Sequence, residues 1–230
     1  DRKYLNRIAE LNYGNARRNP LAQTRGWQFN ALSFTDDDNA NPLIEPGTRL
    51  LDVGCGDGQL LDYLVHVKGV DGRGIELSSD GVHACVSSGL PVIQGDAETD
   101  LADFPSQAFD YVVLSQTLQA MRAPKRTLQQ LLRIGRRAVV SMPNFAHWRY
   151  RSQVLFGGRM PVGRLLHYNW YDTPNIHLCS IRDFVTLAGE MGVTIERGLF
   201  LDDRSVPRRL GRSLRLANLL GEQAIFLLKS

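Results

Sequence analysis

From Thr48 onward, short apolar runs alternate with stretches whose apolar residues recur every three or four positions. The runs are typical of buried strands, and the longer period is typical of helices that pack one face on a core. This alternation predicts βαβ units, and hence an α/β fold with a mostly parallel sheet and helices on both faces. Seven strands are expected, at 49–53, 73–77, 91–94, 109–114, 137–142, 194–200 and 224–229. Helices are expected at 57–67, 79–88, 125–134 and 181–191.

Two segments lie outside this alternation. Residues 1–45 are rich in Asn, Arg and Asp, and only Tyr4–Leu11 has a helical pattern. This predicts an N-terminal arm or cap on a main domain at 46–230. Residues 144–177 are rich in aromatic side chains and directly follow the fifth strand. Because ligands bind beyond the carboxyl ends of the strands in an open parallel sheet, this insertion is predicted to be a lid or a docking surface.

Composition limits the class of protein. Hydrophobic residues make up 43% and charged residues 22%, as in an average globular domain. No apolar run is long enough to span a bilayer, and the first residues lack the apolar core of a secretory signal. The three cysteines are far apart and odd in number, which favours reduced thiols over disulfides or a zinc site. We therefore expect a cytoplasmic protein with neither a membrane partner nor a metal site.

The net charge of +3 is modest, and much of the basic excess falls late in the chain. The arginines of this late cluster are Arg204, Arg208, Arg209, Arg212 and Arg215. No aromatic residues are interleaved with them, unlike in typical nucleic-acid interfaces. Leu210, Leu214 and Ala217 recur at helical spacing in the same segment, which predicts an amphipathic helix with a solvated basic side. Nucleic acid is therefore not an expected partner.

The sharpest local pattern is a glycine-rich turn between the first strand and the following helix. Its sequence is Asp52-Val53-Gly54-Cys55-Gly56-Asp57-Gly58. Gly54 and Gly56 leave space for a tight turn and for a ligand that approaches the backbone. Gly58 opens the helix, whose free N–H groups favour an anionic group. The spacing differs from the G-x-G-x-x-G of dinucleotide-binding proteins, which disfavours a nicotinamide-dependent oxidoreductase.

Acidic residues follow the next two strands at the same edge of the sheet. Glu76 and Leu77 end the second strand, where a carboxylate can accept hydrogen bonds from both hydroxyls of a ribose. Asp96 and Ala97 follow the third strand, where an adenine amino group would lie. Together with the glycine turn, these positions make three ligand-facing loops in the order that a nucleoside ligand requires. An ordinary tight turn is the weaker interpretation.

These loops resemble those of class I S-adenosylmethionine-dependent methyltransferases, which have a Rossmann-like fold. The resemblance implies S-adenosylmethionine or S-adenosylhomocysteine as the ligand. The residues expected at its site are Asp52, Gly54, Cys55, Gly56, Glu76, Leu77, Asp96, Ala97, Ser115 and Gln116. The glycine turn would surround the methionine half, Glu76 the ribose and Asp96 the adenine. Ser115 and Gln116 would lie near the transferable methyl group, and Cys55 would be a packing residue and not a nucleophile.

Three longer segments narrow the resemblance to one family. They are Ser141–Arg149 (SMPNFAHWR), Gly158–Val162 (GRMPV) and Asn169–Cys179 (NWYDTPNIHLC). With the glycine turn, they are similar to the methionine biosynthesis protein MetW family over residues 46–202 and 222–228, whereas the first 45 residues do not match. Members of that family are associated with homoserine O-acyltransferases, which implies such an enzyme as the partner of this chain.

The residues leave catalysis open. Methyl transfer to oxygen or carbon often needs a base, and four side chains of the insertion are weak candidates for which a structural role is the favoured interpretation. These are His147, Tyr171, Asp172 and His177. Residue types that are common at interface hot spots gather in the same insertion. They are Trp148, Arg149, Arg159, Trp170 and Tyr171.

Three functional hypotheses follow. The resemblance favours a ligand-binding accessory or regulatory subunit of a homoserine O-acyltransferase. The second hypothesis is an active S-adenosylmethionine-dependent methyltransferase that acts on a small-molecule acceptor beneath an aromatic lid. The third is a nicotinamide-dependent oxidoreductase, which the glycine spacing disfavours.

Overall fold

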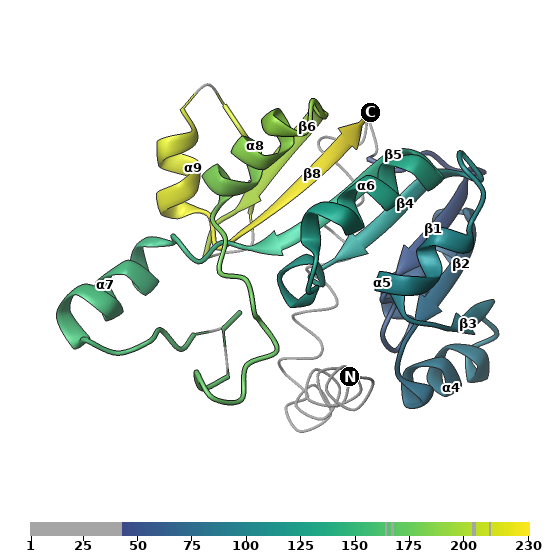
Figure 1. Ribbon diagram of the computed structural model, residues 1–230, viewed down its shortest axis with the longest axis horizontal. Helices are drawn as coiled ribbons and strands as arrows, with labels where there is room; N and C mark the ends of the chain where they lie inside the picture. The colour runs from purple at the N-terminus through teal and green to yellow at the C-terminus, as the bar shows by residue number, and fades with distance from the viewer. Residues whose placement is uncertain (1–42, 164, 167, 204–205, 212) are drawn as a thin grey trace.

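The computed structural model describes residues 43–163, 165–166, 168–203, 206–211 and 213–230. Its core is one mixed sheet of eight strands with helices on both faces (Figure 1). This is the α/β, Rossmann-like architecture that the sequence predicts. The arm or cap expected at 1–45, with its helix at Tyr4–Leu11, lies outside the described residues except for 43–45.

The strands follow the sequence pattern closely. Their bounds are β1 Arg49–Val53, β2 Asp71–Glu76, β3 Val92–Gln94, β4 Phe109–Ser115, β5 Gly135–Pro143, β6 Thr194–Leu201, β7 Pro207–Arg209 and β8 Gln223–Lys229. Their order in the sheet is β3-β2-β1-β4-β5-β8-β6-β7. The pairs from β3 to β5 are parallel, whereas β8 runs antiparallel to both β5 and β6. The seven expected strands are all present, with ends within two residues of the prediction.

The eighth strand, β7, corrects the sequence prediction. It pairs antiparallel with β6 inside the basic segment for which a single amphipathic helix is expected. The helix α9 (Leu214–Leu220) begins only after it, because the proline at the start of β7 disfavours a continuous helix. Leu210 lies outside the helix, and its N–H donates to the carbonyl of Gly198 in β6 at 2.8 Å. Arg204 and Arg212 lie outside the described residues.

Helices cover both faces of the sheet because alternate strand residues point to opposite sides. They are α3 Gln59–His66, α4 Ser79–Ser87, α5 Ala97–Asp100, α6 Pro124–Ile134 and α8 Ile181–Glu190, with 3-10 turns η1 Leu101–Asp103 and η2 Leu118–Ala120. Leu114 and Val140 face the core beneath α6 and α8, and Val113 and Val139 face the core beneath α3. No helix in the described part of the chain is long and apolar enough to cross a membrane.

The insertion at 144–177 leaves the sheet at the end of β5 and contains the helix α7 (Trp148–Gly157). Figure 1 shows α7 standing away from the sheet and from the helices that cover it. The amide of Asn144, which is fully buried, anchors the start of the insertion. It donates to the carbonyls of Asn218 and Gly221 at 2.9 and 2.6 Å, and accepts from the N–H groups of Ala146 and Ile181 at 3.1 and 3.4 Å. The insertion is thereby fastened to α8 and to the end of α9.

Candidate ligand-binding pocket

The glycine-rich turn joins β1 to α3 in a conformation that requires glycine. The φ angle is +71° at Gly54, +60° at Gly56 and +81° at Gly58, a region that side chains rarely adopt. The N–H groups of Gly54 and Cys55 both donate to the carbonyl of Ile75 in β2, at 2.8 and 3.3 Å. The turn therefore lies against the carboxyl end of β2 and presents backbone to its surroundings.

Glu76, the last residue of β2, fixes this turn with its side chain. Its Oε2 accepts the N–H of Gly56 at 2.8 Å, and its Oε1 accepts the N–H of Ser78 at 2.9 Å. The residue is 6% exposed. Because each carboxylate oxygen has two lone-pair directions, both oxygens can accept one further hydrogen bond. The carboxylate is thus held rigidly and keeps capacity for hydroxyl donors.

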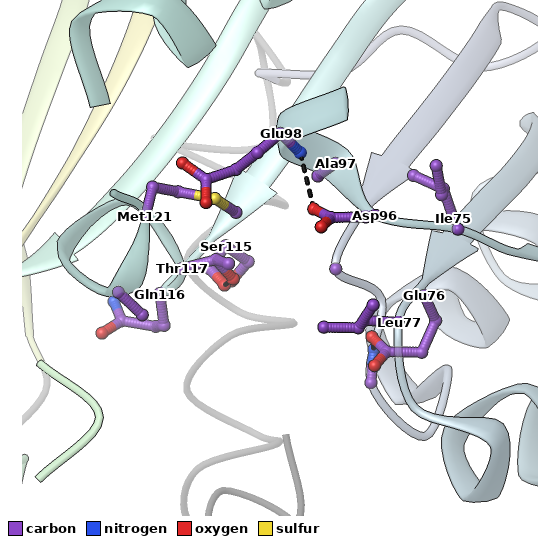
Figure 2. Close-up of a pocket in the computed structure, with 14 residues that line it drawn as sticks. Ile75, Glu76, Leu77, Asp96, Ala97, Glu98, Ser115, Gln116, Thr117 and Met121 are labelled. Atoms are coloured by element: carbon purple, nitrogen blue, oxygen red, sulfur yellow. Dashed lines mark hydrogen bonds between the residues drawn. The ribbon is translucent and has the colours of Figure 1, made fainter. Parts of the chain in front are cut away.

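The turn and Glu76 form one side of a pocket of about 300 Å³. Figure 2 shows Glu76 and Leu77 on one side of the pocket, Ser115 and Gln116 on the other, and Asp96 above them. The lining residues are Gly54, Gly56, Ile75, Glu76, Leu77, Gly95, Asp96, Ala97, Glu98, Ser115, Gln116, Thr117, Ala120 and Met121. Eight of the ten residues expected at the ligand are in this lining, and they carry carboxylates but neither lysine nor arginine.

Asp96 and Glu98 organise the third-strand side of the pocket. Oδ1 of Asp96 accepts the N–H of Glu98 at 2.9 Å, which caps the first turn of α5 and leaves Oδ2 for other donors. Oε1 of Glu98 accepts the N–H groups of Arg122 and Ala123 at 2.8 and 2.9 Å. These bonds join the loop after β3 to the connection between β4 and α6, so that the two walls of the pocket have a fixed separation.

The β4 wall contains a strained residue. Gln116 has a φ of +53°, which is uncommon for a residue with a side chain. Its N–H donates to the carbonyl of Ser141 in β5 at 3.0 Å, and the Oγ atoms of Ser115 and Ser141 lie 3.2 Å apart. The side chain of Thr117 lies 3.3 Å from the position that a Cβ on Gly54 would take. A side chain on this glycine would therefore press tightly against Thr117.

Several lining residues were not predicted from the sequence. Ile75 and Thr117 directly adjoin predicted positions, so that extending each loop by one residue would have found them. Ala120 and Met121 reach the pocket because η2 turns the chain back after β4. Glu98 directly follows Ala97, a predicted position, so that the same extension by one residue would have found it.

Asp52 and Cys55 belong to the predicted set but do not line the pocket. Asp52 is buried beneath the turn, and its Oδ1 has no hydrogen-bond partner among the described residues. Burial raises the pKa of this carboxyl to about 7, and the nearby charge of Glu76 contributes to the rise. The carboxyl thus holds its proton more tightly than an exposed aspartic acid does.

Cys55 packs beneath the turn against the second buried cysteine of the chain. Its Sγ lies 3.9 Å from Sγ of Cys85 and fills the space that a side chain on Gly74 would take. The contact with Cys85 and burial both raise the pKa of the Cys55 thiol. Because the thiolate is the reactive form, Cys55 is suited to packing and not to nucleophilic attack. Among the described residues, no group of three or more His, Cys, Asp or Glu side chains could hold a metal ion.

The weak candidates for a catalytic base lie outside the pocket lining. His147 is buried at the start of α7 between the rings of Trp148 and Tyr150, and burial lowers its pKa. Tyr171 is exposed with its ring edge-on to a tryptophan, and Asp172 is also exposed. The described lining therefore offers carboxylates, hydroxyls and an amide, but no imidazole or phenol.

His177 occupies a different place, on the outer side of the pocket wall. The N–H groups of Ile176 and His177 both donate to the carbonyl of Gln119 in η2 at 3.0 Å. The side chain of Gln119 in turn donates to the carbonyl of Gln116, a lining residue, at 2.6 Å. Nε2 of His177 lies 3.4 Å from the carbonyl of Arg122. The end of the insertion is thus attached to a wall of the pocket.

A family model agrees with this architecture. The model for methionine biosynthesis protein MetW matches residues 35–228. The chain belongs to the MetW family. The resemblance that the glycine turn and the three longer segments carry in the sequence is thereby confirmed. The expected bounds are corrected, because the match also includes residues 35–45 and 203–221.

Curated relatives match parts of this MetW-family chain. The bifunctional methionine biosynthesis protein MetXA/MetW of Rhodopirellula baltica is 33% identical over 176 residues, which are 73% of this chain and 28% of the relative. A fatty-acid O-methyltransferase of Mycolicibacterium smegmatis is 40% identical over 99 residues, 41% of this chain and 35% of that protein. The chain thus spans about a third of the length of these relatives.

Solved structures share the fold. A methyltransferase dependent on S-adenosylmethionine from Thermotoga maritima superposes with a TM-score of 0.69 at 14% identity, covering 96% of this chain and 97% of that one. Phosphoethanolamine N-methyltransferase 2 of Haemonchus contortus, solved with S-adenosylmethionine, has a TM-score of 0.57 at 13% identity and covers 81% of this chain and 49% of that one. At these identities the likeness shows the fold alone, which is that of class I methyltransferases.

Proposed function

We propose that this chain binds S-adenosylmethionine or S-adenosylhomocysteine in the pocket and acts in the cytoplasm as an accessory or regulatory subunit of a homoserine O-acyltransferase. The observation that carries the ligand assignment is the carboxylate of Glu76, which two backbone amides hold against the glycine turn. Its remaining lone pairs suit two ribose hydroxyls. Oδ2 of Asp96 suits an adenine amino group, and Ile75, Leu77 and Met121 supply apolar surface for the base.

The glycine turn suits the methionine half of this ligand. Gly54 and Gly56 line the pocket with backbone, which allows close approach of a chain that carries both an ammonium and a carboxylate. The carboxylates of the lining provide negative charge, and the buried Asp52 adds to it when it is ionised. Such charge favours the ammonium and sulfonium groups of S-adenosylmethionine.

The partner assignment rests on the relative in which MetXA and MetW share one polypeptide. MetXA corresponds to the homoserine O-acyltransferase that the family resemblance implies. We infer that the insertion provides the docking surface and that its attachment to η2 makes docking sensitive to the ligand. A ligand changes the affinity of a protein for its partner only if some contact in the protein differs between the ligand-bound and ligand-free states. The bonds from Ile176 and His177 to the carbonyl of Gln119 join the insertion to the pocket wall, and we assign that role to them.

Calorimetry tests the ligand directly. We expect S-adenosylmethionine or S-adenosylhomocysteine to bind with a micromolar dissociation constant, which corresponds to about 8 kcal/mol. NAD is the matched control, because its adenosine half is shared whereas the glycine turn lacks dinucleotide spacing. Heat with NAD and none with the other two ligands would contradict the assignment.

Replacing Glu76 tests the ribose position. Glu76→Ala should weaken ligand binding by about 1.5–3 kcal/mol, because hydrogen bonds to a charged acceptor are the stronger kind. Asp80→Ala, an exposed acidic residue in the first turn of α4, is the matched control and should leave affinity unchanged. The unfolding midpoint without ligand checks that the turn still forms. Equal affinity of Glu76→Ala and the parent would place the ribose elsewhere.

Co-purification and enzyme assay test the partner. We expect this chain to form a complex with the homoserine O-acyltransferase of the same genome, and the acylation rate to differ with and without this chain. Titrating S-adenosylmethionine into the complex should change that rate, whereas the isolated acyltransferase should not respond. If the chain binds the ligand normally but forms no complex with the acyltransferase, the ligand assignment stands and the partner assignment is wrong.

A second candidate function is methyl transfer to a small-molecule acceptor. The match to a fatty-acid O-methyltransferase over 99 residues favours it. The distinguishing measurement is release of S-adenosylhomocysteine from S-adenosylmethionine in the presence of candidate acceptors. Turnover that is independent of the acyltransferase would favour this function over the regulatory one.

A further inference from the structure

The helix α7 carries an apolar face that the rest of the described chain does not cover. Tyr150 is the buried residue of α7, with 3% exposed. Trp148 and Leu155 are two helical turns apart and lie on the side opposite Tyr150, and Phe156 follows at the edge of the same side. Leu155 is 75% exposed and Phe156 84%. Figure 1 shows that this helix projects from the body of the molecule.

The helix is held firmly despite its position. The side-chain amide of Gln153 donates to the carbonyl of Val162 at 3.1 Å and accepts the N–H of Val162 at 2.9 Å, which fastens the chain that returns from α7. At the base of the helix, Arg149 forms an ion pair with Asp203 at 2.9 Å and lies over the ring of Trp148. The apolar face is therefore presented in a fixed geometry, which lowers the entropic cost of binding.

The chain of α7 and its two flanks carries only basic charged side chains, and Asp203 pairs with one of them, Arg149, at the base of the helix. Residues 144–171 contain no aspartate or glutamate, whereas arginines occur at 149, 151, 159 and 164. Arg159 directly follows the helix and is exposed. A surface that complements α7 must therefore combine an apolar groove with carboxylates at its border.

We propose that α7 docks as a helix in an apolar, acid-bordered groove of the homoserine O-acyltransferase, with Leu155 and Phe156 as its anchors. The inference rests on the proposed function, which supplies the partner. It assigns the contact to the outer turn of α7 and not to the exposed pair Trp170 and Tyr171. Helix-in-groove binding uses exposed apolar anchors on one side of a helix, and the last turn of α7 presents two such residues, Leu155 and Phe156.

The test compares the full-length parent with the double variant Leu155→Ser, Phe156→Ser by biolayer interferometry against the purified acyltransferase. We expect the dissociation constant to rise at least 30-fold, because buried anchors dominate such interfaces. Arg159→Glu should lower the association rate about threefold or more at low salt. Val86→Ser, an exposed apolar residue on α4, is the matched control and should bind as the parent does.

Two further measurements make the outcome decisive. Calorimetry with S-adenosylmethionine should give the same affinity for the parent and the double variant, because α7 lies outside the pocket lining. Unchanged acyltransferase binding by the double variant overturns the inference and leaves the proposed function intact. Failure of the parent to bind overturns both. A third outcome is that the parent is a dimer, the double variant is a monomer, and both bind the acyltransferase equally. In that case the apolar face of α7 binds a second copy of this chain, and the inference is also overturned.

Discussion

Asn144→Ala is expected to lower the free energy of unfolding by about 4 kcal/mol or more. The side chain is fully buried and makes four hydrogen bonds, two to carbonyl groups and two from N–H groups. Alanine leaves these backbone groups without partners, and each unsatisfied buried group costs about 1–3 kcal/mol. The groups belong to α8, to the segment after α9 and to the start of the insertion, so that three parts of the chain lose a common contact. Denaturant unfolding followed by circular dichroism measures the change.

Asn169→Ala is the matched control, because this asparagine is exposed in the same insertion. It should change stability by no more than about 0.5 kcal/mol, as surface substitutions usually do. A midpoint for Asn144→Ala equal to that of the parent would show that water or a local shift satisfies the four groups. Loss of the acyltransferase complex in Asn144→Ala, with ligand binding retained, would identify the anchor as a support of the insertion.

The sequence predicts the sheet well because burial imposes a period on each strand and helix. The run from Tyr111 to Leu114 is apolar on both faces, as a central parallel strand requires, and it lies in β4 between β1 and β5. The helix predicted for the basic segment is only partly confirmed, because Leu214 and Ala217 lie in α9 whereas Leu210 does not. Its spacing of Leu210, Leu214 and Ala217 matches a helix, but Leu210 is held by a backbone bond to β6. Tertiary contacts override a weak period when the segment is short and contains a proline.

The pocket shows where local patterns stop being informative. The glycine turn and the strand ends place Gly54, Glu76 and Asp96 together because parallel strands end at a common edge. The side-chain direction of Asp52 depends on the face of β1 it occupies, and burial beneath the turn is a property of the packed sheet. The projection of α7 was likewise not predictable, since the amphipathic signal of this helix is weak and its aromatic residues fit a lid as well as a docking surface.

Asp52→Asn is expected to raise the free energy of unfolding at pH 8 by about 3 kcal/mol. Burial holds the pKa of Asp52 at about 7 in the folded state, against an ordinary value of 3.8, and each tenfold change in the ionisation constant corresponds to about 1.4 kcal/mol. A buried amide donor without a partner costs about 1 kcal/mol and offsets part of the gain. In the parent, the folded state keeps a proton that the unfolded state loses. Stability therefore falls as pH rises from about 4 to about 7, and the full penalty is present above that range.

The same substitution should act on ligand binding in the opposite direction. Positive charge on a bound S-adenosylmethionine favours the ionised form of Asp52, so that binding to the parent at pH 6 releases a proton and tightens as pH rises toward 8. Asp52→Asn should bind about tenfold or more weakly at pH 8 and release none. Calorimetry in two buffers of different ionisation enthalpy measures the proton, and denaturant unfolding from pH 5 to 8 measures stability. If the binding heat of the parent does not depend on the buffer, no proton is released and Asp52 does not respond to the ligand. If Asp52→Asn is more stable but binds the ligand as the parent does, the buried carboxyl lowers stability without contributing to binding.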